Sequence, residues 1–149
     1  MDPTISTILG ALLGALLTGP LTYYFTKNLM RLQEFNKAAV VFRSAFVEQI
    51  QFLDHFYAVD RAGRDIPDVL AAAADKHEDA LFIFKDGFFS KKQRGEIEEA
   101  WKIYTGENKT MGKYTFSQYA TINKLKEEDM RKLALERIKR LLKFAEPKD

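Results

Sequence analysis

The sequence predicts an all-α protein in which one N-terminal transmembrane helix continues into an antiparallel bundle of about four helices. Apolar residues recur at helical spacing along most of the 149 residues, and no stretch alternates apolar and polar residues as a half-buried strand would. An uncharged run also stands near the start of the chain, from Pro3 to Thr26. We therefore expect a membrane anchor over residues 1–26 and a helical cytoplasmic domain over residues 27–149.

The uncharged run is rich in Leu, Ala and Gly, and a helix of about 20 such residues crosses the hydrocarbon core of a bilayer. A cleaved signal peptide would instead need basic residues before the run and small residues at its end. Here the run closes on Tyr23, Tyr24 and Phe25, and aromatic residues are typical of a membrane interface. A retained transmembrane helix is the prediction.

The charges beside the run give the expected span a direction. Lys27, Arg31 and further basic residues follow it, whereas Asp2 precedes it. Because positively charged flanks stay in the cytoplasm, we expect a single-pass protein with its N-terminus outside and its C-terminal domain in the cytoplasm.

Small residues form one strip of the predicted span, which we expect to be a helix-packing surface in the membrane. The strip consists of Gly10, Ala11, Gly14, Ala15 and Gly19. Such a flat strip lets two helices approach closely, so a homodimer through this helix is one predicted association. Gly and Ala are also common in spans that stay alone. Pro20 predicts a kink near the cytoplasmic end.

A long amphipathic helix follows, continuous with the anchor and ending between Asp60 and Gly63. Its apolar stripe consists of Leu29, Leu32, Phe35, Ala39, Phe42, Phe46, Ile50, Leu53, Phe56 and Tyr57. A second helix begins near Asp65, with Pro67 in its first turn, and ends near Gly87.

A third helix begins at Ser90, where Gln93 supplies a capping-box partner, and ends at Gly106. Residues 107–112 are polar and without pattern, so they predict a loop, followed by a short helical turn around Phe116 and Tyr119. The last helix spans about residues 123–145, with acidic residues at its start and basic residues at its end, as the helix dipole favours. The core of the bundle is expected to be rich in Phe.

The composition excludes several classes of site. The chain has no cysteine, which rules out disulfides, thiolate metal sites and cysteine nucleophiles. The net charge is +2, from 23 basic and 21 acidic residues that are interleaved along the sequence, and nucleic-acid binding would favour a concentrated basic face. We therefore predict no nucleic-acid partner.

The two histidines, His55 and His77, are the candidates for metal chemistry. A helical carboxylate site would use Glu-x-x-His, but the residues three positions earlier are Phe52 and Ala74. No nucleophile elbow or glycine-rich phosphate loop is present either. We predict structural histidines, no metal, no cofactor and no enzymatic activity, with an undetected metal-binding protein or enzyme as an alternative.

Several short motifs resemble a family of small uncharacterised bacterial proteins that have one N-terminal span and a helical cytoplasmic domain. The motifs are Glu34 to Ala39, Phe42 to Phe46, Lys76 to Ala80 with Phe84, Ala100 to Tyr104, Leu133 to Ile138, Leu142, Phe144 and Ala145. The resemblance implies a bacterial source and a location in the inner membrane, and it assigns no activity. Within these motifs Arg43, His77 and Trp101 form a candidate polar cluster.

The sequence as a whole predicts a membrane-anchored interaction or scaffold protein that binds a protein partner through a helical domain. One alternative is a holin-like or toxin-like membrane-active protein, which the small size, the single Gly-rich span and the basic C-terminal helix favour.

Overall fold

A computed structural model describes the backbone of residues 3–54, 65–120 and 127–148, and the side chains of these residues from Thr18 onward. Within these ranges the chain forms five α-helices, one two-stranded hairpin and two single turns of 3₁₀ helix. The helices are α1 (Pro3–Ser44), α2 (Val47–Asp54), α3 (Ile66–Phe88), α4 (Lys91–Thr105) and α5 (Glu127–Leu142). The strands are β1 (Lys109–Thr110) and β2 (Lys113–Tyr114), and the 3₁₀ turns are η2 (Ser117–Tyr119) and η4 (Lys143–Ala145).

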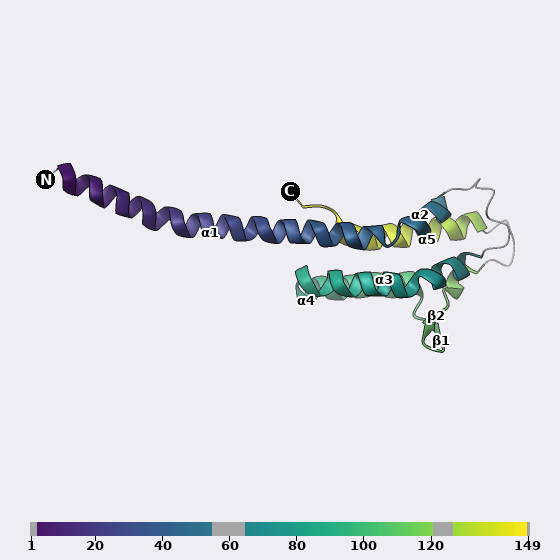
Figure 1. Ribbon diagram of the computed structural model, residues 1–149. Coiled ribbons are helices and arrows are strands. Elements are labelled where there is room, and N and C mark those ends of the chain that lie inside the picture. Colours follow the sequence, from purple (N-terminus) through teal and green to yellow (C-terminus); the bar gives the residue numbers. More distant parts are fainter. Residues whose placement is uncertain (1–2, 55–64, 121–126, 149) are drawn as a thin grey trace.

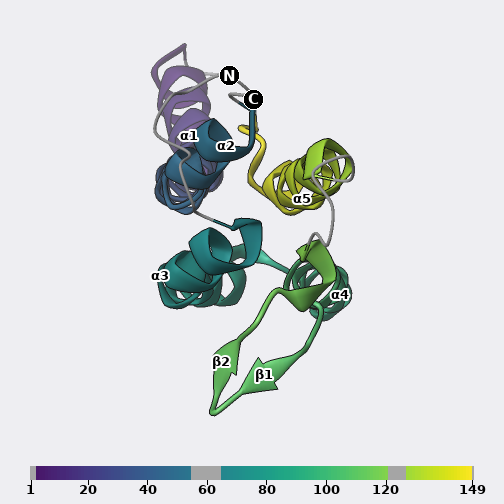
Figure 2. The same cartoon turned by 90° about the vertical axis from the view of Figure 1, so that its right-hand side faces the viewer.

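The helices stand in four columns, which Figure 2 shows end-on: α1 with α2, then α3, α4 and α5. Neighbouring columns run in opposite directions, so the bundle alternates up and down (Figure 1). The predicted all-α class is confirmed. The N-terminal part of α1 leaves the bundle and extends far beyond the ends of α3 and α4 (Figure 1).

The predicted membrane anchor is wrong. Among the residues that the structure describes, no helix is long and apolar enough to cross a membrane. The prediction took the absence of charge as a measure of apolarity, yet Thr, Gly, Pro and Tyr make up much of the run between Thr18 and Thr26, and Lys27 follows directly in the same helix. This finding contradicts the single-pass topology and the inner-membrane location.

The long helix that begins in α1 breaks earlier than its apolar stripe predicts. At Ala45 the backbone N–H lies 3.3 Å from the carbonyl oxygens of both Val41 and Phe42, and Phe46 N–H donates to the Arg43 carbonyl at 3.2 Å. These bonds tighten the last turn of α1, and α2 then starts at Val47. The predicted end of the helix, between residues 60 and 63, lies outside the described residues.

The predicted caps of α4 are confirmed at both ends. Gln93 N–H donates to Ser90 Oγ at 3.4 Å, and Ser90 N–H donates to Gln93 Oε1 at 3.1 Å, which completes the capping box. Gly106 closes the helix in the left-handed region, with a φ of 72° and an N–H bond of 2.8 Å to the Lys102 carbonyl.

The segment predicted as a loop after Gly106 contains a small β-hairpin instead. Lys109 pairs with Tyr114 and Thr110 pairs with Lys113. Met111 and Gly112 make the turn with φ values of 52° and 81°, as the two central residues of a type I′ turn require. Two residues per strand are too few to show alternation, which is why the sequence pattern gave no signal.

The core is rich in Phe, as predicted. Phe42 of α1 stacks on Phe84 of α3 with ring centroids 4.9 Å apart, and Phe35 lies 5.6 Å from both Phe84 and Phe88. The same apolar stripe of α1 therefore fixes α1 on α3, and aromatic contacts of this kind add stability beyond the area they bury.

Candidate functional site

The three residues of the predicted polar cluster do not meet at one point. Arg43 is exposed on α1, whereas His77 is fully buried in α3. Trp101 of α4 is buried and donates its Nε1–H to the Tyr114 hydroxyl at 3.0 Å. The rings of His77 and Trp101 share one neighbour, Tyr104, at centroid distances of 6.0 and 5.5 Å.

His77 forms hydrogen bonds through both ring nitrogens. Its Nε2 lies 3.1 Å from two acceptors, the Ala45 carbonyl oxygen and Gln49 Oε1, so Nε2 carries the proton and donates. Its Nδ1 then accepts from the Tyr104 hydroxyl, at 3.1 Å. The ring also stacks on Phe46 at 4.0 Å. One imidazole therefore joins α3 to α4 and to the junction of α1 with α2.

Burial lowers the pKa of His77 from 6.5 to about 4, because the apolar surroundings disfavour the charged imidazolium. The bond to the Ala45 carbonyl opposes this effect, and the charge of Lys76 adds to it. Burial also raises the pKa of Tyr104 well above its usual value. Both groups are neutral near pH 7, and neither His77 nitrogen is free to bind a metal.

Metal-ligating side chains do not gather anywhere in the described part of the chain: no three His, Cys, Asp or Glu residues are placed to hold one ion. His55, the other predicted candidate, lies outside the described residues. The arrangement around His77 is that of a structural hydrogen-bond network, with its donors and acceptors matched to neighbours.

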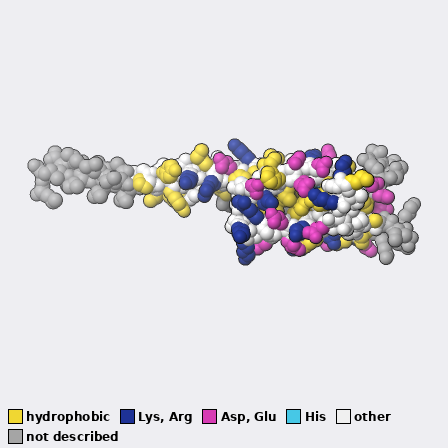
Figure 3. Space-filling view, turned by 90° about the horizontal axis from the view of Figure 1, so that it is seen from below, with side chains coloured by type: hydrophobic (Ala, Val, Ile, Leu, Met, Phe, Trp, Pro, Cys, Tyr) yellow, Lys and Arg dark blue, Asp and Glu magenta, His cyan; other side chains and the backbone are white. Residues whose placement is uncertain are grey.

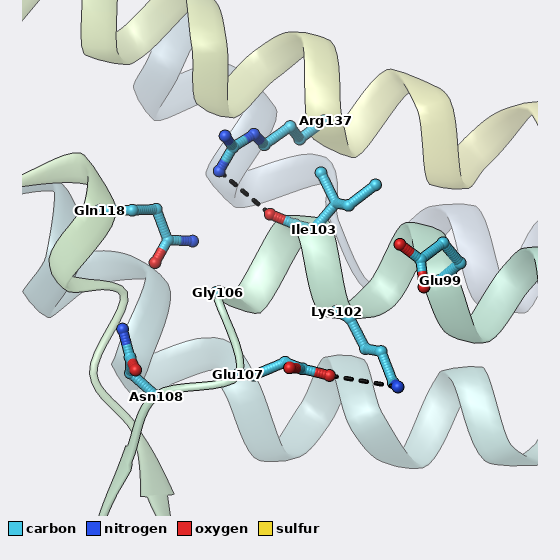
Figure 4. Close-up of a pocket in the computed structure, with 8 residues that line it drawn as sticks. All are labelled: Glu99, Lys102, Ile103, Gly106, Glu107, Asn108, Gln118 and Arg137. Atoms are coloured by element: carbon cyan, nitrogen blue, oxygen red, sulfur yellow. Dashed lines mark hydrogen bonds and ion pairs between the residues drawn. The ribbon is translucent and has the colours of Figure 1, made fainter.

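A surface cavity of about 460 Å³ lies at the C-terminal end of α4, between α5 and the segment that follows the hairpin (Figure 4). Several of its polar side chains are already engaged, but Gln118 Oε1 is buried there without a hydrogen-bond partner. Arg137 donates to the Ile103 carbonyl at 3.0 Å, Gln118 Nε2 donates to the Tyr104 carbonyl at 2.8 Å, and Lys102 pairs with Glu107 at 3.2 Å. Arg137 and Gln118 thereby cap carbonyl groups in the last turn of α4, which would otherwise stay unpaired.

The strongest candidate for a functional surface is the outward continuation of the α1 stripe. Within the bundle, Phe35 and Phe42 of this stripe are 3% and 1% exposed. Beyond the bundle the stripe continues with the residues that we call the outer stripe: Leu21, Phe25, Leu29 and Leu32. Leu32 is half-buried at the base, whereas Leu29, Phe25 and Leu21 are 56%, 64% and 60% exposed.

Further large apolar side chains are exposed on the other faces of the projecting part of α1. Tyr23, Tyr24 and Met30 are exposed on the same part of α1, and Figure 3 shows hydrophobic side chains along the projecting helix. An exposed patch of this kind on a single helix marks an interaction surface more often than a scattered Leu does. The sequence prediction missed it, because Leu21 and Phe25 were assigned to the anchor.

The predicted small-residue strip lies on the same projecting helix. Gly10, Ala11, Gly14 and Ala15 belong to the backbone of α1, but their side-chain surroundings lie outside the described residues. At Gly19 no heavy atom lies within 4 Å of where a Cβ would be, so this position is open.

No family model, curated protein or solved structure matches the chain. The resemblance to a family of small single-span bacterial proteins is therefore wrong, because no family model supports it and no described helix is a membrane span. Short motifs such as Ala100 to Tyr104 repeat the alternation of apolar and charged residues that many amphipathic helices share.

Proposed function

We propose that this chain is a helical interaction protein that uses the projecting part of α1 as its docking element. The observation that carries the proposal is the change in exposure along one stripe of one helix, from Phe35 in the core to Phe25 in solvent. The residue types of the stripe do not become polar where the bundle ends. A helix face that remains apolar is suited to a second protein surface.

The energetics favour a covered stripe. Burying a Leu or Phe side chain fully stabilises a complex by roughly 1.5–3 kcal/mol. The outer stripe has four such side chains, three of them more than half exposed. Side chains of this size are enough to offset much of the entropy lost on association.

The bundle supports docking by fixing the direction of the projecting helix. α1 is one helix from Pro3 to Ser44, and its C-terminal half is packed on α3 through Phe35 and Phe42. The outer stripe is thus held on a helix that is anchored in a core, and a preorganised surface loses less entropy on binding than a flexible one. This proposal keeps the interaction or scaffold role predicted from the sequence and drops the membrane anchor on which that prediction rested. That the chain binds no nucleic acid or cofactor and catalyses no reaction stays a prediction.

The test is site-specific photo-crosslinking of the full chain in its native cells. A photoreactive phenylalanine analogue replaces Phe25 in one sample and Val41 in the other. Val41 is a matched control, because it is exposed to a similar degree on the same helix but lies within the bundle section. We expect at least about ten times more protein adduct from position 25. Equal yields, or no adduct at position 25, would contradict the proposal.

A further inference from the structure

We infer that another protein binds the exposed part of α1 with one amphipathic α-helix, which takes the place that α3 occupies within the bundle. A bulky apolar side chain of that helix fills the hollow where α3 ends. This inference rests on the proposed docking function of α1 and names the kind of partner. Two observations carry it: the seam between α1 and α3 runs on past the end of α3, and a hollow lies where α3 stops.

The first observation is that the interface of α1 with α3 is a helix–helix seam that continues beyond α3. Its residues follow one another at alternating steps of four and three, which is the spacing at which one helix packs on another. In order they are Leu21, Phe25, Asn28, Leu32, Phe35, Ala39 and Phe42. Phe84 of α3 packs on Phe42 and Phe35, at ring centroid distances of 4.9 and 5.6 Å. α3 ends at Phe88, whereas α1 extends far beyond it (Figure 1).

The uncovered part of the seam keeps the side chains of a helix interface. Leu21 and Phe25 are exposed, Leu32 is half-buried, and Leu29 stands directly beside the seam. Asn28 is a polar member, and a single polar residue in such a seam fixes the register of the facing helix. From Leu21 to Leu32 the seam is about 16 Å long, given a rise of about 1.5 Å per residue, so a partner helix of about three turns covers it.

The second observation is a hollow of about 560 Å³ at the end of α3. Its apolar lining comes from Leu32 and Phe35 of the seam and from Phe88, the last residue of α3. A helix that lies along the uncovered seam brings the side chains of one of its ends to this hollow, which has room for a Leu or Phe. Anchors of this size in a pocket carry much of the binding energy when a helix docks in a groove.

The charges at the rim of the hollow add to the description of the partner. Arg31, Lys148 and Glu34 line the hollow, so basic groups outnumber acidic ones there. Arg31 forms no ion pair with the side chains that the structure describes. An acidic residue next to the apolar anchor of the partner helix pairs with Arg31, since charges that flank a seam select its partner.

Photo-crosslinking of the full chain in its native cells, with mapping of the adduct by mass spectrometry, tests whether the partner segment is a helix. The photoreactive phenylalanine analogue replaces Leu21 in one sample and Leu32 in the other. A partner helix places the two adducts in one segment, about 11 residues apart. A partner strand would place them about five residues apart, and that spacing, or adducts in two separate segments, would overturn the inference.

Met30 is the control for the face of α1. Its exposure is similar to that of Leu21, but it lies nine residues further along the helix, which is half a turn away from the seam. We expect at least about ten times less adduct from position 30 than from position 21. Equal yields at the two positions would show that the partner does not bind through the seam.

A side chain placed in the hollow tests the anchor. Gly87 lines the hollow, and no heavy atom lies within 4 Å of where its Cβ would be, so Gly87→Leu fits the fold and fills part of the hollow. We expect the adduct yield at position 25 to fall by at least about tenfold. Gly95→Leu is the matched control, because Gly95 of α4 is equally open and does not line the hollow. It should change the yield by less than about twofold, and circular dichroism should show equal helix content in both variants.

Arg31→Glu tests the charge of the partner. It should lower the adduct yield at position 25 by about fivefold or more, because a carboxylate at the rim repels an acidic residue of the partner helix. Lys27→Glu makes the same change of charge on the projecting part of α1 but outside the hollow, so its effect should be smaller. An equal effect of the two substitutions would overturn the pairing of Arg31 with the partner.

The outcomes separate this inference from the proposed function. An adduct at position 25 that Gly87→Leu does not reduce overturns the anchored helix and leaves the docking function in place. An adduct that maps to a second copy of this chain has the same consequence. The absence of any adduct at position 25 overturns both.

Discussion

Nε2 of His77 in α3 lies 3.1 Å from the carbonyl oxygen of Ala45, the residue at which α1 gives way to α2. The two residues are 32 positions apart in the sequence. The break between α1 and α2 therefore coincides with a contact between two columns of the bundle. Neither Pro nor Gly stands between Ser44 and Val47. His77 donates to the Ala45 carbonyl at this break, and its hydrogen-bond network continues to α4 through the Tyr104 hydroxyl.

Replacing His77 should destabilise the protein strongly. In His77→Leu the Ala45 carbonyl, Gln49 Oε1 and the Tyr104 hydroxyl lose their shared partner inside the core. We expect the free energy of unfolding to fall by about 2–4 kcal/mol, because buried polar groups without partners are costly. Urea denaturation followed by circular dichroism measures this change.

The neighbouring residue supplies the control for that substitution. Lys76 is exposed and makes a long ion pair of 4.0 Å with Glu48. Lys76→Ala should change the free energy of unfolding by less than about 0.5 kcal/mol. If His77→Leu proves as mild as Lys76→Ala, the hydrogen bonds of His77 do not support the core as described.

The lowered pKa of His77 predicts that acid weakens the fold. In the folded chain the pKa is about 4, whereas an unfolded histidine titrates near its usual value of 6.5. Between these values the unfolded chain binds a proton that the folded chain does not, so the contribution of His77 is lost as the pH falls from 6.5 to 4. The expected loss is about 3 kcal/mol, and it levels off below pH 4.

Comparison with His77→Gln isolates this effect from that of the carboxylates. Glutamine keeps an N–H that can donate to the Ala45 carbonyl, but it does not titrate. The difference in unfolding free energy between the two proteins should narrow as the pH falls from 6.5 to 4. A difference that stays constant over this range would mean that the folded and unfolded pKa values of His77 are alike.

The elements that the sequence predicted well are those determined by nearby residues. Ser90 with Gln93, and Gly106 in the left-handed region, set the ends of α4 through contacts within a few positions. The stripe from Phe35 to Phe46 was also visible, because a buried helix face imposes its spacing on the sequence.

The features that the sequence did not predict depend on residues distant in the chain, or on what covers an apolar helix face. The end of α1 at Ser44 depends on residues of α3, which no local signal announces. Leu21 and Phe25 were recognised as apolar, but an uncharged helix can be covered by lipid or by protein, and the residues alone do not distinguish the two. The polar cluster failed for a similar reason, because the motif does not reveal that Arg43 faces solvent.

Arg131 of α5 should be as important to α2 as His77 is. It is buried, donates to the Phe52 carbonyl at 2.8 Å, and is held by Glu127 at 3.0 Å from Nε and 2.8 Å from Nη2. Arg131→Met should lower the free energy of unfolding by about 2–3 kcal/mol, since Phe52 and Glu127 both lose their donor. Amide hydrogen exchange should then accelerate first in α2.

Lys132→Met is the matched control for Arg131. Lys132 also pairs with a glutamate four residues earlier, Glu128, at 2.7 Å, but both side chains are exposed. We expect a change within about 0.5 kcal/mol for this exposed pair. An Arg131→Met protein with normal exchange in α2 would show that the bond to the Phe52 carbonyl contributes little.

The hairpin tip offers a stabilising substitution. Met111 has a φ of 52° and its side chain is completely exposed, so it gains nothing from packing in this chain. The first central position of a type I′ turn favours Asn, which tolerates a positive φ better than Met does. Met111→Asn should therefore raise the free energy of unfolding by about 0.5–1 kcal/mol, measured by urea denaturation. Gly112→Ala, at the neighbouring position with a φ of 81°, should act in the opposite direction by a similar amount or more, since alanine is strained there. A Met111→Asn protein that is less stable than the parent would contradict this reasoning. It would show that the Met111 side chain is covered in solution, for example by a partner, because only the burial of Met111 could outweigh the lower backbone strain of Asn in the turn.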